Sequence, residues 1–326
     1  MFNIGLSEYI NRNKLIINNK NLKPDLWLFE NIEKQSLKLK IEGQGKLLKK
    51  IETIEICRGV TTGYNPAFII NSEDRIKLIK SNKSSKSIIK PLLKGRNIRK
   101  WHYEFNDEYL IFTRRGIDID NYSAVLKHLE TYYEELKPRE EGDEKGRKSG
   151  NYEWFEIQDN TAYYKEFEQK EKIIWGLTAD KWAFAYDNGQ HYLPSNGYIL
   201  TSKKIPVKYI LSILNSSLMK FYFDFIGIMT AGGAFTLKHG TILEFPLAEI
   251  DKPELFIQKV NTILDNKYNT TLINEIESII DLMVYKLYTL TYDECRIIDP
   301  EIGKLISRED YERMGVEELA EWELSE

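Results

Sequence analysis

The sequence predicts an α+β protein, in which a mixed, twisted β-sheet domain with packed helices is followed by a helical C-terminal region. Short β-rich runs separated by glycine-bearing turns follow one another from position 51, as is typical of a sheet. Two stretches, 207–226 and 271–290, carry apolar residues at helical spacing. We expect residues 1–44 to be a linker segment, 45–250 to form the sheet domain, and 251–326 to form the helical region with an acidic tail.

The strands and helices expected along the chain follow from these two patterns. Strands are expected where β-branched and aromatic residues cluster between turn residues, at 54–56, 67–70, 109–113, 172–177 and in two runs within 182–201. Helices are expected at 26–37, 121–136, 207–226 and 271–290. The Asn188-Gly189 pair predicts a hairpin. Thr291 and Glu294 have capping-box spacing for one more short helix, and the charged stretch 137–153 reads as a mobile surface loop.

Composition restricts the class of protein. The longest apolar runs, such as 221–228, are far shorter than the roughly 20 residues that a membrane span needs. The N-terminal sequence has no secretory leader pattern. Only Cys57 and Cys295 are present, far apart in sequence, so no disulfide framework is expected. These observations favour a cytoplasmic protein without membrane insertion.

Charge is segregated along the chain, although the formal net charge is only −4. Between Lys83 and Arg115, nine Lys and Arg residues face three acidic residues, and between Glu301 and Glu326 the ratio is reversed. A basic block of this kind attracts a phosphate backbone. A solvated surface without a ligand gives the same pattern, and charge alone does not separate the two interpretations.

Known catalytic motifs are not found. Asn65-Pro66-Ala67-Phe68 resembles the tetrapeptide with which amino-methyltransferases hold a flipped adenine, but Ala67 replaces the second proline and no cofactor-binding glycine motif precedes it. We therefore expect this tetrapeptide to be a turn that leads into a strand. The four histidines lack neighbours at metal-ligand spacing. No catalytic residue and no metal site is predicted, and whether the chain is itself an enzyme stays open.

Several stretches together resemble one family. "CRGVTTGYNPAFII" and "IIKPLLKGRNIRKW" resemble two signature segments of the TaqI-like C-terminal specificity domain, the target-recognition domain of type IIG and related restriction-modification enzymes. In the second segment Asn97 stands where the family has Asp. Further blocks follow in the family's order, namely "LKHLETYYEELKPR", "GNYEWFEI", "LSILNSSLMKFYF", "TAGGAFTLKHGTILEFPL" and "IIDLMVYKLYTLTYDE". The resemblance extends from about 45 to 300.

The resemblance implies sequence-specific binding of double-stranded DNA on behalf of an adenine-N6 methyltransferase domain. That catalytic domain lies N-terminal to the recognition domain in the family, so the chain is expected to be a piece of a longer enzyme or a separate specificity polypeptide. S-adenosylmethionine would be bound by the catalytic domain, as would Mg²⁺ if the parent enzyme also cleaves DNA. No cofactor is expected in this chain.

Candidate DNA contacts follow from the basic residues and from the glycine turns. Glycines permit close approach of the backbone to DNA, and Arg and Lys clamp phosphates or read guanine. The candidate side chains are Thr61, Thr62, Tyr64, Lys90, Lys94, Arg96, Arg99, Lys100, Arg114, Arg115, Arg147, Lys148 and Lys238. The candidate glycines are Gly59, Gly63, Gly95, Gly232 and Gly233.

Three alternatives remain open at this stage. The chain could contain a cryptic nuclease centre, or it could be a protein-assembly module that uses the amphipathic stretch 271–290 as its contact surface. A third alternative is recognition of single-stranded nucleic acid or RNA through the many Tyr and Trp side chains. Most of these aromatic residues lie at core-like spacing, which disfavours the third alternative.

Overall fold

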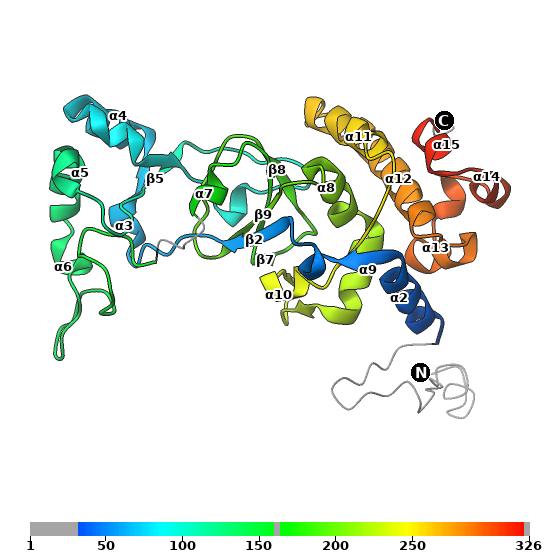
Figure 1. Cartoon of the computed structure of the whole chain (residues 1–326), viewed down its shortest axis with the longest axis horizontal. Coiled ribbons are helices and arrows are strands. Elements are labelled where there is room, and N and C mark those ends of the chain that lie inside the picture. The colour runs from blue at the N-terminus through cyan, green and yellow to red at the C-terminus, as the bar shows by residue number, and fades with distance from the viewer. Residues whose placement is uncertain (1–31, 160–163, 323–326) are drawn as a thin grey trace, which may run out of the picture.

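The computed structural model describes residues 32–159 and 164–322. The chain is elongated, with a lobe that combines short strands and helices (the mixed lobe) at one end and a helical region at the other (Figure 1). A central sheet separates the two. The α+β class predicted from the sequence is confirmed, and the strands of the described residues are divided among four small antiparallel sheets.

The central sheet has the strand order β2-β9-β6-β8, formed by Ile54–Arg58, Gly197–Ser202, Lys172–Gly176 and Ala185–Asp187. Strand β6 is buried along its whole length. Successive side chains of a strand point to opposite faces. Ile173 and Trp175 accordingly join the core on the helical side, whereas Ile174 joins the core of the mixed lobe. The expected strands at 54–56 and 172–177 correspond to β2 and β6.

The mixed lobe covers one face of the central sheet. Its own sheet has the order β3-β5-β4, formed by Ile69–Asn71, Glu108–Ile111 and Ile89–Pro91. Three helices, α4 (Ser72–Ser81), α5 (Ser123–Glu130) and α6 (Tyr133–Leu136), lie at this end of the molecule (Figure 1). Val125 and Leu129 of α5 are fully buried, so the helix seals this second core.

The helical region covers the opposite face. It consists of α2 (Ile32–Gln44), α8 (Val207–Asn215), α9 (Ser217–Ile226), α11 (Glu254–Asp265), α12 (Thr270–Leu287), α13 (Tyr292–Ile298), η6 (Ile302–Lys304), α14 (Arg308–Arg313) and α15 (Val316–Ala320). The expected helix at 271–290 is α12. The predicted capping box is present at α13, where the Thr291 side chain accepts from the Glu294 amide and the Glu294 carboxylate accepts from the Thr291 amide.

Two small sheets complete the body. One pairs β1 (Gly45–Leu47) with β12 (Pro246–Ala248). The other has the order β10-β11-β7, formed by Ile228–Met229, Phe235–Thr236 and Thr178–Ala179. Short helical turns, including η2 (Leu48–Lys50), η3 (Lys83–Ser87), η5 (Ile119–Tyr122), α7 (Tyr164–Phe167) and α10 (His239–Ile242), connect these elements.

Two expected helices are each divided into shorter elements. The stretch 207–226 forms α8 and α9, which are separated at Ser216, because the Ser216 hydroxyl caps α9 by accepting from the Met219 amide. The stretch 121–136 forms η5, α5 and α6. Here the Thr131 hydroxyl donates to the His128 carbonyl and ends α5. In both places a local side-chain hydrogen bond competes with helix continuation. Part of the helix expected at 26–37 lies outside the described residues, and α2 begins at Ile32.

The strand expected at 67–70 begins two residues later than predicted. Asn65–Phe68 forms the single helical turn α3, with Pro66 in its first turn, where a proline fits well. Strand β3 follows at Ile69. The expectation that this tetrapeptide is a turn leading into a strand agrees with this arrangement.

The predicted Asn188-Gly189 hairpin is wrong. Strands β8 and β9 both pair with β6 and not with each other. The buried Asp187 carboxylate accepts from the Gly189 amide at 2.7 Å and from the His191 ring Nδ1 at 2.8 Å. It also pairs with the Lys172 ammonium at 2.7 Å, and both side chains are fully buried. This polar network directs the chain away from a tight turn and into the segment 188–196.

The hydrophobic core runs across the proposed boundary at 250. One buried cluster includes Leu37 of α2, Trp175 of β6, Phe256 of α11 and Leu319 of α15. The division at 45 and 250 therefore stays a prediction based on sequence composition. Among the described residues, no helix has the length and apolar character that crossing a bilayer requires.

Candidate functional site

Two adjoining surface depressions bring together the two segments that carry the family resemblance. One is lined by residues 60–63 of the glycine turn (residues 59–63), by Lys94, Gly95 and Arg96, and by residues 194–196. The other is lined by residues 95–100 and 176–183. Gly95, Arg96 and Thr178 line both depressions. We call this continuous hollow the glycine-turn cleft.

The absence of a side chain at two glycines shapes the turn. A Cβ atom at Gly59 would overlap the carbonyl oxygens of Leu193 and Pro194. Gly63 adopts a φ of +79°, and a Cβ there would lie 2.6 Å from Arg147 Cδ. Both positions therefore require glycine, one for close approach and the other also for backbone conformation.

The segment from Tyr192 to Gly197 joins the two walls of the cleft. The Val60 amide donates to the Leu193 carbonyl at 2.9 Å, and the Gly59 amide donates to the Gly197 carbonyl at 2.9 Å. On the other side, the Leu93 amide donates to the Tyr192 carbonyl at 2.9 Å. Residues 59–63 and 93–96 are thus held by one segment, although they are far from it in sequence.

Lys94 and Arg96 share one carboxylate. Lys94 Nζ lies 2.5 Å from Glu108 Oε1, and Arg96 Nη2 lies 3.2 Å from Glu108 Oε2. The Arg96 side chain is 66% exposed, whereas that of Glu108 is 21% exposed. The 3₁₀ turn η4 (Gly95–Asn97) presents both cations, because the Asn97 side chain accepts from the Lys94 amide at 2.8 Å.

Arg99 and Lys100 also have carboxylate partners. Arg99 Nη2 lies 2.7 Å from Glu104, and Lys100 Nζ lies 2.8 Å from Glu277 of α12. Glu277 additionally accepts from the Trp101 indole. The basic block is consequently neutralised along much of its length, which the sequence does not reveal.

Thr61 and Thr62 line the cleft, but their contributions differ. Thr61 pairs with Asp159 through backbone hydrogen bonds in both directions. Thr62 is 4% exposed, and its hydroxyl donates to Asn65 Oδ1 at 2.7 Å. Tyr64, at the N-terminus of α3, packs against Tyr132. The Thr62 hydroxyl is therefore committed to holding the turn.

Lys90 and Arg114 lie together, but in a different depression. That depression is lined by Ser87, Tyr122 and Tyr164, among other residues. Lys90 pairs with Glu168 at 2.9 Å, and the Arg114 guanidinium lies 4.7 Å from the centre of the Tyr164 ring. The structure does not bring these two cations to the glycine-turn cleft.

Arg147 lies inside the protein, which corrects the expectation that it belongs to a mobile surface loop. It is 3% exposed. Its guanidinium donates to four backbone carbonyls at 2.7 to 3.0 Å, those of Thr62, Leu136, Trp154 and Glu156. Burial lowers its pKa to about 10. In this conformation Arg147 supports the glycine turn from within and is not accessible to DNA.

Arg115 is likewise engaged with the backbone. Its guanidinium donates to the carbonyls of Ile157 and Gln158, each at 2.7 Å. Lys148 is exposed, and its carbonyl accepts from the Tyr152 hydroxyl. Arg115 therefore fastens the segment that follows the 137–153 loop, and Lys148 points away from the interior.

Lys238, Gly232 and Gly233 lie on or beside the β10–β11 hairpin. All three are exposed, and Gly233 has a φ of +80°. Strand β11 pairs with β7, whose Thr178 lines the cleft. The hairpin therefore continues one wall of the cleft outward.

Two further cations near the cleft were missed by the sequence reasoning. Arg58, at the end of β2, donates through Nε to the Ser195 carbonyl at 2.6 Å. Lys181 lines the cleft and is exposed. Arg58 directly precedes Gly59 in the first resemblance segment, so the sequence could have indicated it as a candidate contact. Lys181 stands in no recognisable motif.

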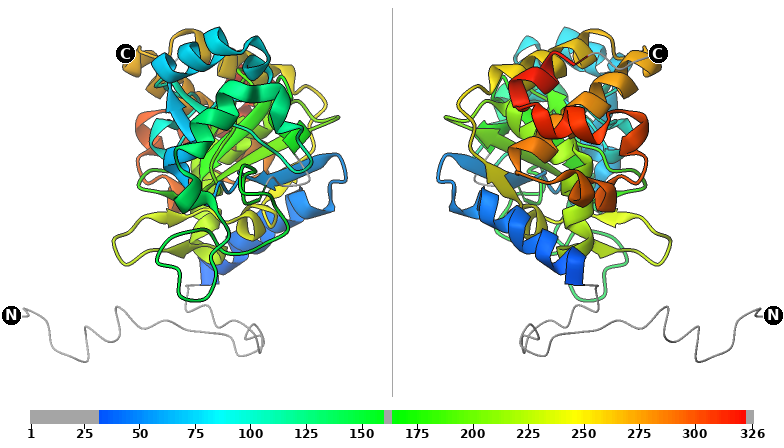
Figure 2. Two further views of the ribbon diagram at one scale, coloured as in Figure 1. Left: turned by 90° about the vertical axis from the view of Figure 1, so that its left-hand side faces the viewer. Right: turned by 90° about the vertical axis from the view of Figure 1, so that its right-hand side faces the viewer.

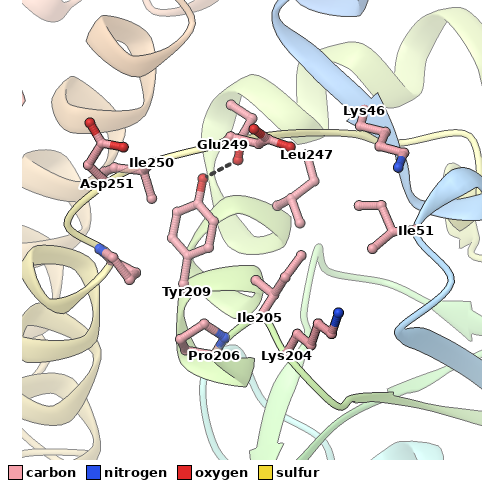
Figure 3. A pocket seen from close by; sticks show the side chains of 12 residues that line it. Lys46, Ile51, Lys204, Ile205, Pro206, Tyr209, Leu247, Glu249, Ile250 and Asp251 are labelled. Atoms are coloured by element: carbon pink, nitrogen blue, oxygen red, sulfur yellow. Dashed lines mark hydrogen bonds between the residues drawn. The ribbon is translucent and has the colours of Figure 1, made fainter.

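A separate depression lies between the β1–β12 sheet and α8 (Figure 3). Its floor is apolar, with Ile205 and Leu247, and its rim carries Lys46 and Glu249. The Tyr209 hydroxyl donates to the Ala248 carbonyl at 2.6 Å across this region. Charges of both signs at the rim distinguish it from the glycine-turn cleft.

Within residues 32–159 and 164–322, no group of three or more His, Cys, Asp or Glu side chains is arranged to hold a metal ion. Burial raises the pKa of the Cys57 and Cys295 thiols to about 12. The two buried cysteines are therefore poor nucleophiles at neutral pH.

Comparison with known proteins gives one family match. Residues 90–247 match the family model of the TaqI-like C-terminal specificity domain. The glycine turn (residues 59–63) lies outside the matched range, on its N-terminal side, and the basic half of the cleft lies within the range. No curated protein matches the chain.

Two solved structures are similar in shape. One is the type IIL restriction-modification enzyme MmeI in complex with DNA, at 11% identity and a TM-score of 0.49. The other is the type IIG restriction endonuclease BpuSI, at 15% identity and a TM-score of 0.46. The alignments cover 80% and 82% of this chain but only 36% and 33% of those two chains. Over residues 90–247, the family match confirms the resemblance to the TaqI-like C-terminal specificity domain that was drawn from the sequence.

Proposed function

We propose that this chain recognises a specific sequence in double-stranded DNA through the glycine-turn cleft, on behalf of an adenine-N6 methyltransferase of a restriction-modification system. The observation that carries the proposal is the meeting of the glycine turn and the Lys94–Lys100 segment in one cleft. The match to a specificity domain over residues 90–247 supports it.

The cleft offers two kinds of donor. Arg96 and Arg99 provide forked guanidinium groups, which suit phosphate oxygens and the O6 and N7 atoms of guanine. Lys94 and Lys100 provide point charges. Contacts to phosphates would set the register of the duplex, and the more exposed Arg96 would read a base edge.

The carboxylate partners orient these cations before DNA arrives. Glu104 and Glu108 each hold an arginine at the surface. Exposed ion pairs of this kind contribute only about 0–1 kcal/mol. A phosphate group can therefore replace the carboxylate at little cost.

No catalytic step is assigned to the residues of this chain. A methyltransferase domain of the same or a partner polypeptide would flip the target adenine and transfer the methyl group from S-adenosylmethionine. Mg²⁺ would be needed there if the parent enzyme also cleaves DNA. The role of this chain is to position the duplex.

Selection from a random duplex library, at low salt and then at rising salt, tests the proposal. The expected result is a bound pool that converges on one short motif, with affinity that falls by orders of magnitude as salt rises. Retention of single strands in preference to duplexes would contradict it. So would the absence of retained DNA, provided that adding the methyltransferase domain does not restore retention.

A further inference from the structure

We propose that the β10–β11 hairpin is a wedge that inserts Ile228 and Met229 between two base pairs of the bound duplex. The inference rests on the proposed function, because it assumes that DNA lies in the glycine-turn cleft. It adds a second mode of contact, in which an apolar element deforms the duplex.

The hairpin stands out from the body of the molecule (Figure 2, left view, in yellow-green). Strand β10 pairs only with β11, and β11 pairs with β7, so β10 is the outer edge of this small sheet. Its tip is ordered, because the Thr230 amide donates to the Ala234 carbonyl at 2.8 Å and the Gly233 amide donates to the Thr230 carbonyl at 2.9 Å.

The outer strand exposes two large apolar side chains. Ile228 is 56% exposed and Met229 is 48% exposed. Neighbouring residues of a strand point to opposite faces, so both faces of β10 are apolar and open, and the edge of the strand would enter a base step with one side chain against each of the two base pairs. Exposed apolar side chains are costly on a strand edge that has no partner, and such edges are usually protected by charge. This edge is not protected in that way, since neither residue of β10 is charged.

Lysines surround the hairpin. Lys181 follows β7, Lys238 follows β11, and Lys220 of α9 lies with its ammonium 6.0 Å from the centre of the Phe235 ring. Within the part of the chain that the structure describes, none of the three forms an ion pair. In contrast, Lys94, Arg96, Arg99 and Lys100 are all paired with carboxylates.

An apolar edge flanked by unpaired cations fits a nucleic-acid duplex better than it fits a protein partner. Phosphates would meet the lysines, while the stacked bases between them would receive the apolar side chains. Wedges of Ile, Met, Leu or Phe partly unstack one base step and bend the duplex. Since β7 forms a wall of the cleft and β11 is paired with it, a duplex in the cleft passes the base of the hairpin.

The test uses the full chain and a duplex that it selects from a random library, or a fixed duplex at low salt if selection yields no motif. 2-Aminopurine replaces adenine at each position in turn, because its fluorescence rises when it is unstacked. We expect the 2-aminopurine fluorescence to rise at the position of the unstacked base step when the chain binds. The double variant Ile228→Ser/Met229→Ser should lose this signal and bind about 10- to 100-fold more weakly.

Ile76→Ser is the matched control, since Ile76 of α4 is 58% exposed and lies far from the hairpin. It should keep both the fluorescence signal and the affinity. If the unaltered chain binds DNA and the fluorescence rises at no position, the wedge proposal is overturned while the proposed function stays intact. A double variant that changes self-association but not DNA binding would also overturn it. The absence of any DNA binding by the unaltered chain, both alone and after addition of the methyltransferase domain, would overturn both proposals.

Discussion

Two arginine-bearing regions of the molecule, the Gly95–Lys100 turn and the 137–153 loop, look alike in sequence and differ in structure. Arg96 lies on the cleft surface against the Glu108 carboxylate. Arg147 lies in the interior against four backbone carbonyls. A carboxylate at the surface can be exchanged for a phosphate, whereas a guanidinium that is bound to carbonyls in the interior is out of reach of one. The type of partner, and not the charge, separates a contact residue from a structural one.

The two regions are connected through the glycine turn. Arg147 holds the Thr62 carbonyl at 2.8 Å, and the neighbouring Thr61 and Gly63 line the same cleft as Arg96. Arg147 therefore positions one wall of the cleft, and Arg96 belongs to the other. The comparison predicts that Arg147 controls the stability of the fold and that Arg96 controls DNA binding.

The largest effect is expected for Arg147→Met. Removing the guanidinium leaves four buried carbonyls without this donor, and we expect the free energy of unfolding to fall by about 3–5 kcal/mol. Urea denaturation followed by circular dichroism measures it. Lys148→Met, one residue further along and exposed, should change the stability by less than about 0.5 kcal/mol. Equal stabilities of the two variants would contradict the assignment of Arg147 as a structural residue.

A second prediction concerns a buried carboxylate near Lys100. Its burial distinguishes it from the carboxylate of Glu108 at the surface. Asp281 of α12 accepts from the Ser217 amide at 2.7 Å and from the Ser217 hydroxyl at 2.6 Å. Burial raises the pKa of Asp281 to about 6, against the opposing effect of Lys100. Because the folded pKa exceeds the unfolded value, this group stabilises the fold fully below about pH 4. That contribution is lost as pH rises through about 6.

We expect the Asp281 contribution to change the free energy of unfolding by on the order of 2 kcal/mol between pH 4 and pH 7. Denaturation at several pH values, compared with Asp281→Asn, measures it. The asparagine keeps an acceptor for Ser217 and removes the titration, so the difference between the two proteins should follow a single group with a pKa near 6. A difference that does not vary with pH would contradict the raised pKa.

The smallest effect is expected for Glu108→Gln. This change frees Lys94 and Arg96 from their shared carboxylate, and we expect DNA binding to become tighter by up to about fivefold at low salt. Glu301→Gln, which removes an exposed partner of Lys304 in the helical region, serves as the control. Weaker DNA binding by Glu108→Gln would indicate that the carboxylate itself is needed in the interface.

Much of the fold could be predicted from local patterns. The apolar spacing of α12, the capping box at Thr291 and the β-branched runs of β2 and β6 act within a few residues, so each is visible in the sequence. These features need no knowledge of distant partners.

The remaining features depend on partners that are distant in sequence. Thr62 and Arg147 meet across 85 positions. The buried Asp187, Lys172 and His191 network replaces the expected Asn188-Gly189 hairpin, because an internal ion pair requires strand β6 beside β8. The carboxylates that neutralise the basic block come partly from α12. Composition counts these charges, but it does not show how they pair.

The central claim is that Arg96 in the glycine-turn cleft contacts DNA. The most direct measurement compares Arg96→Ala with Arg313→Ala by fluorescence anisotropy on a duplex that the unaltered chain binds. Arg313 is a close match, since its side chain is 67% exposed and pairs with Asp310 at 2.8 Å, but it lies in α14. We predict about 10- to 100-fold weaker binding for Arg96→Ala, with unchanged stability and no change for Arg313→Ala. Equal affinities of the two variants would contradict the account.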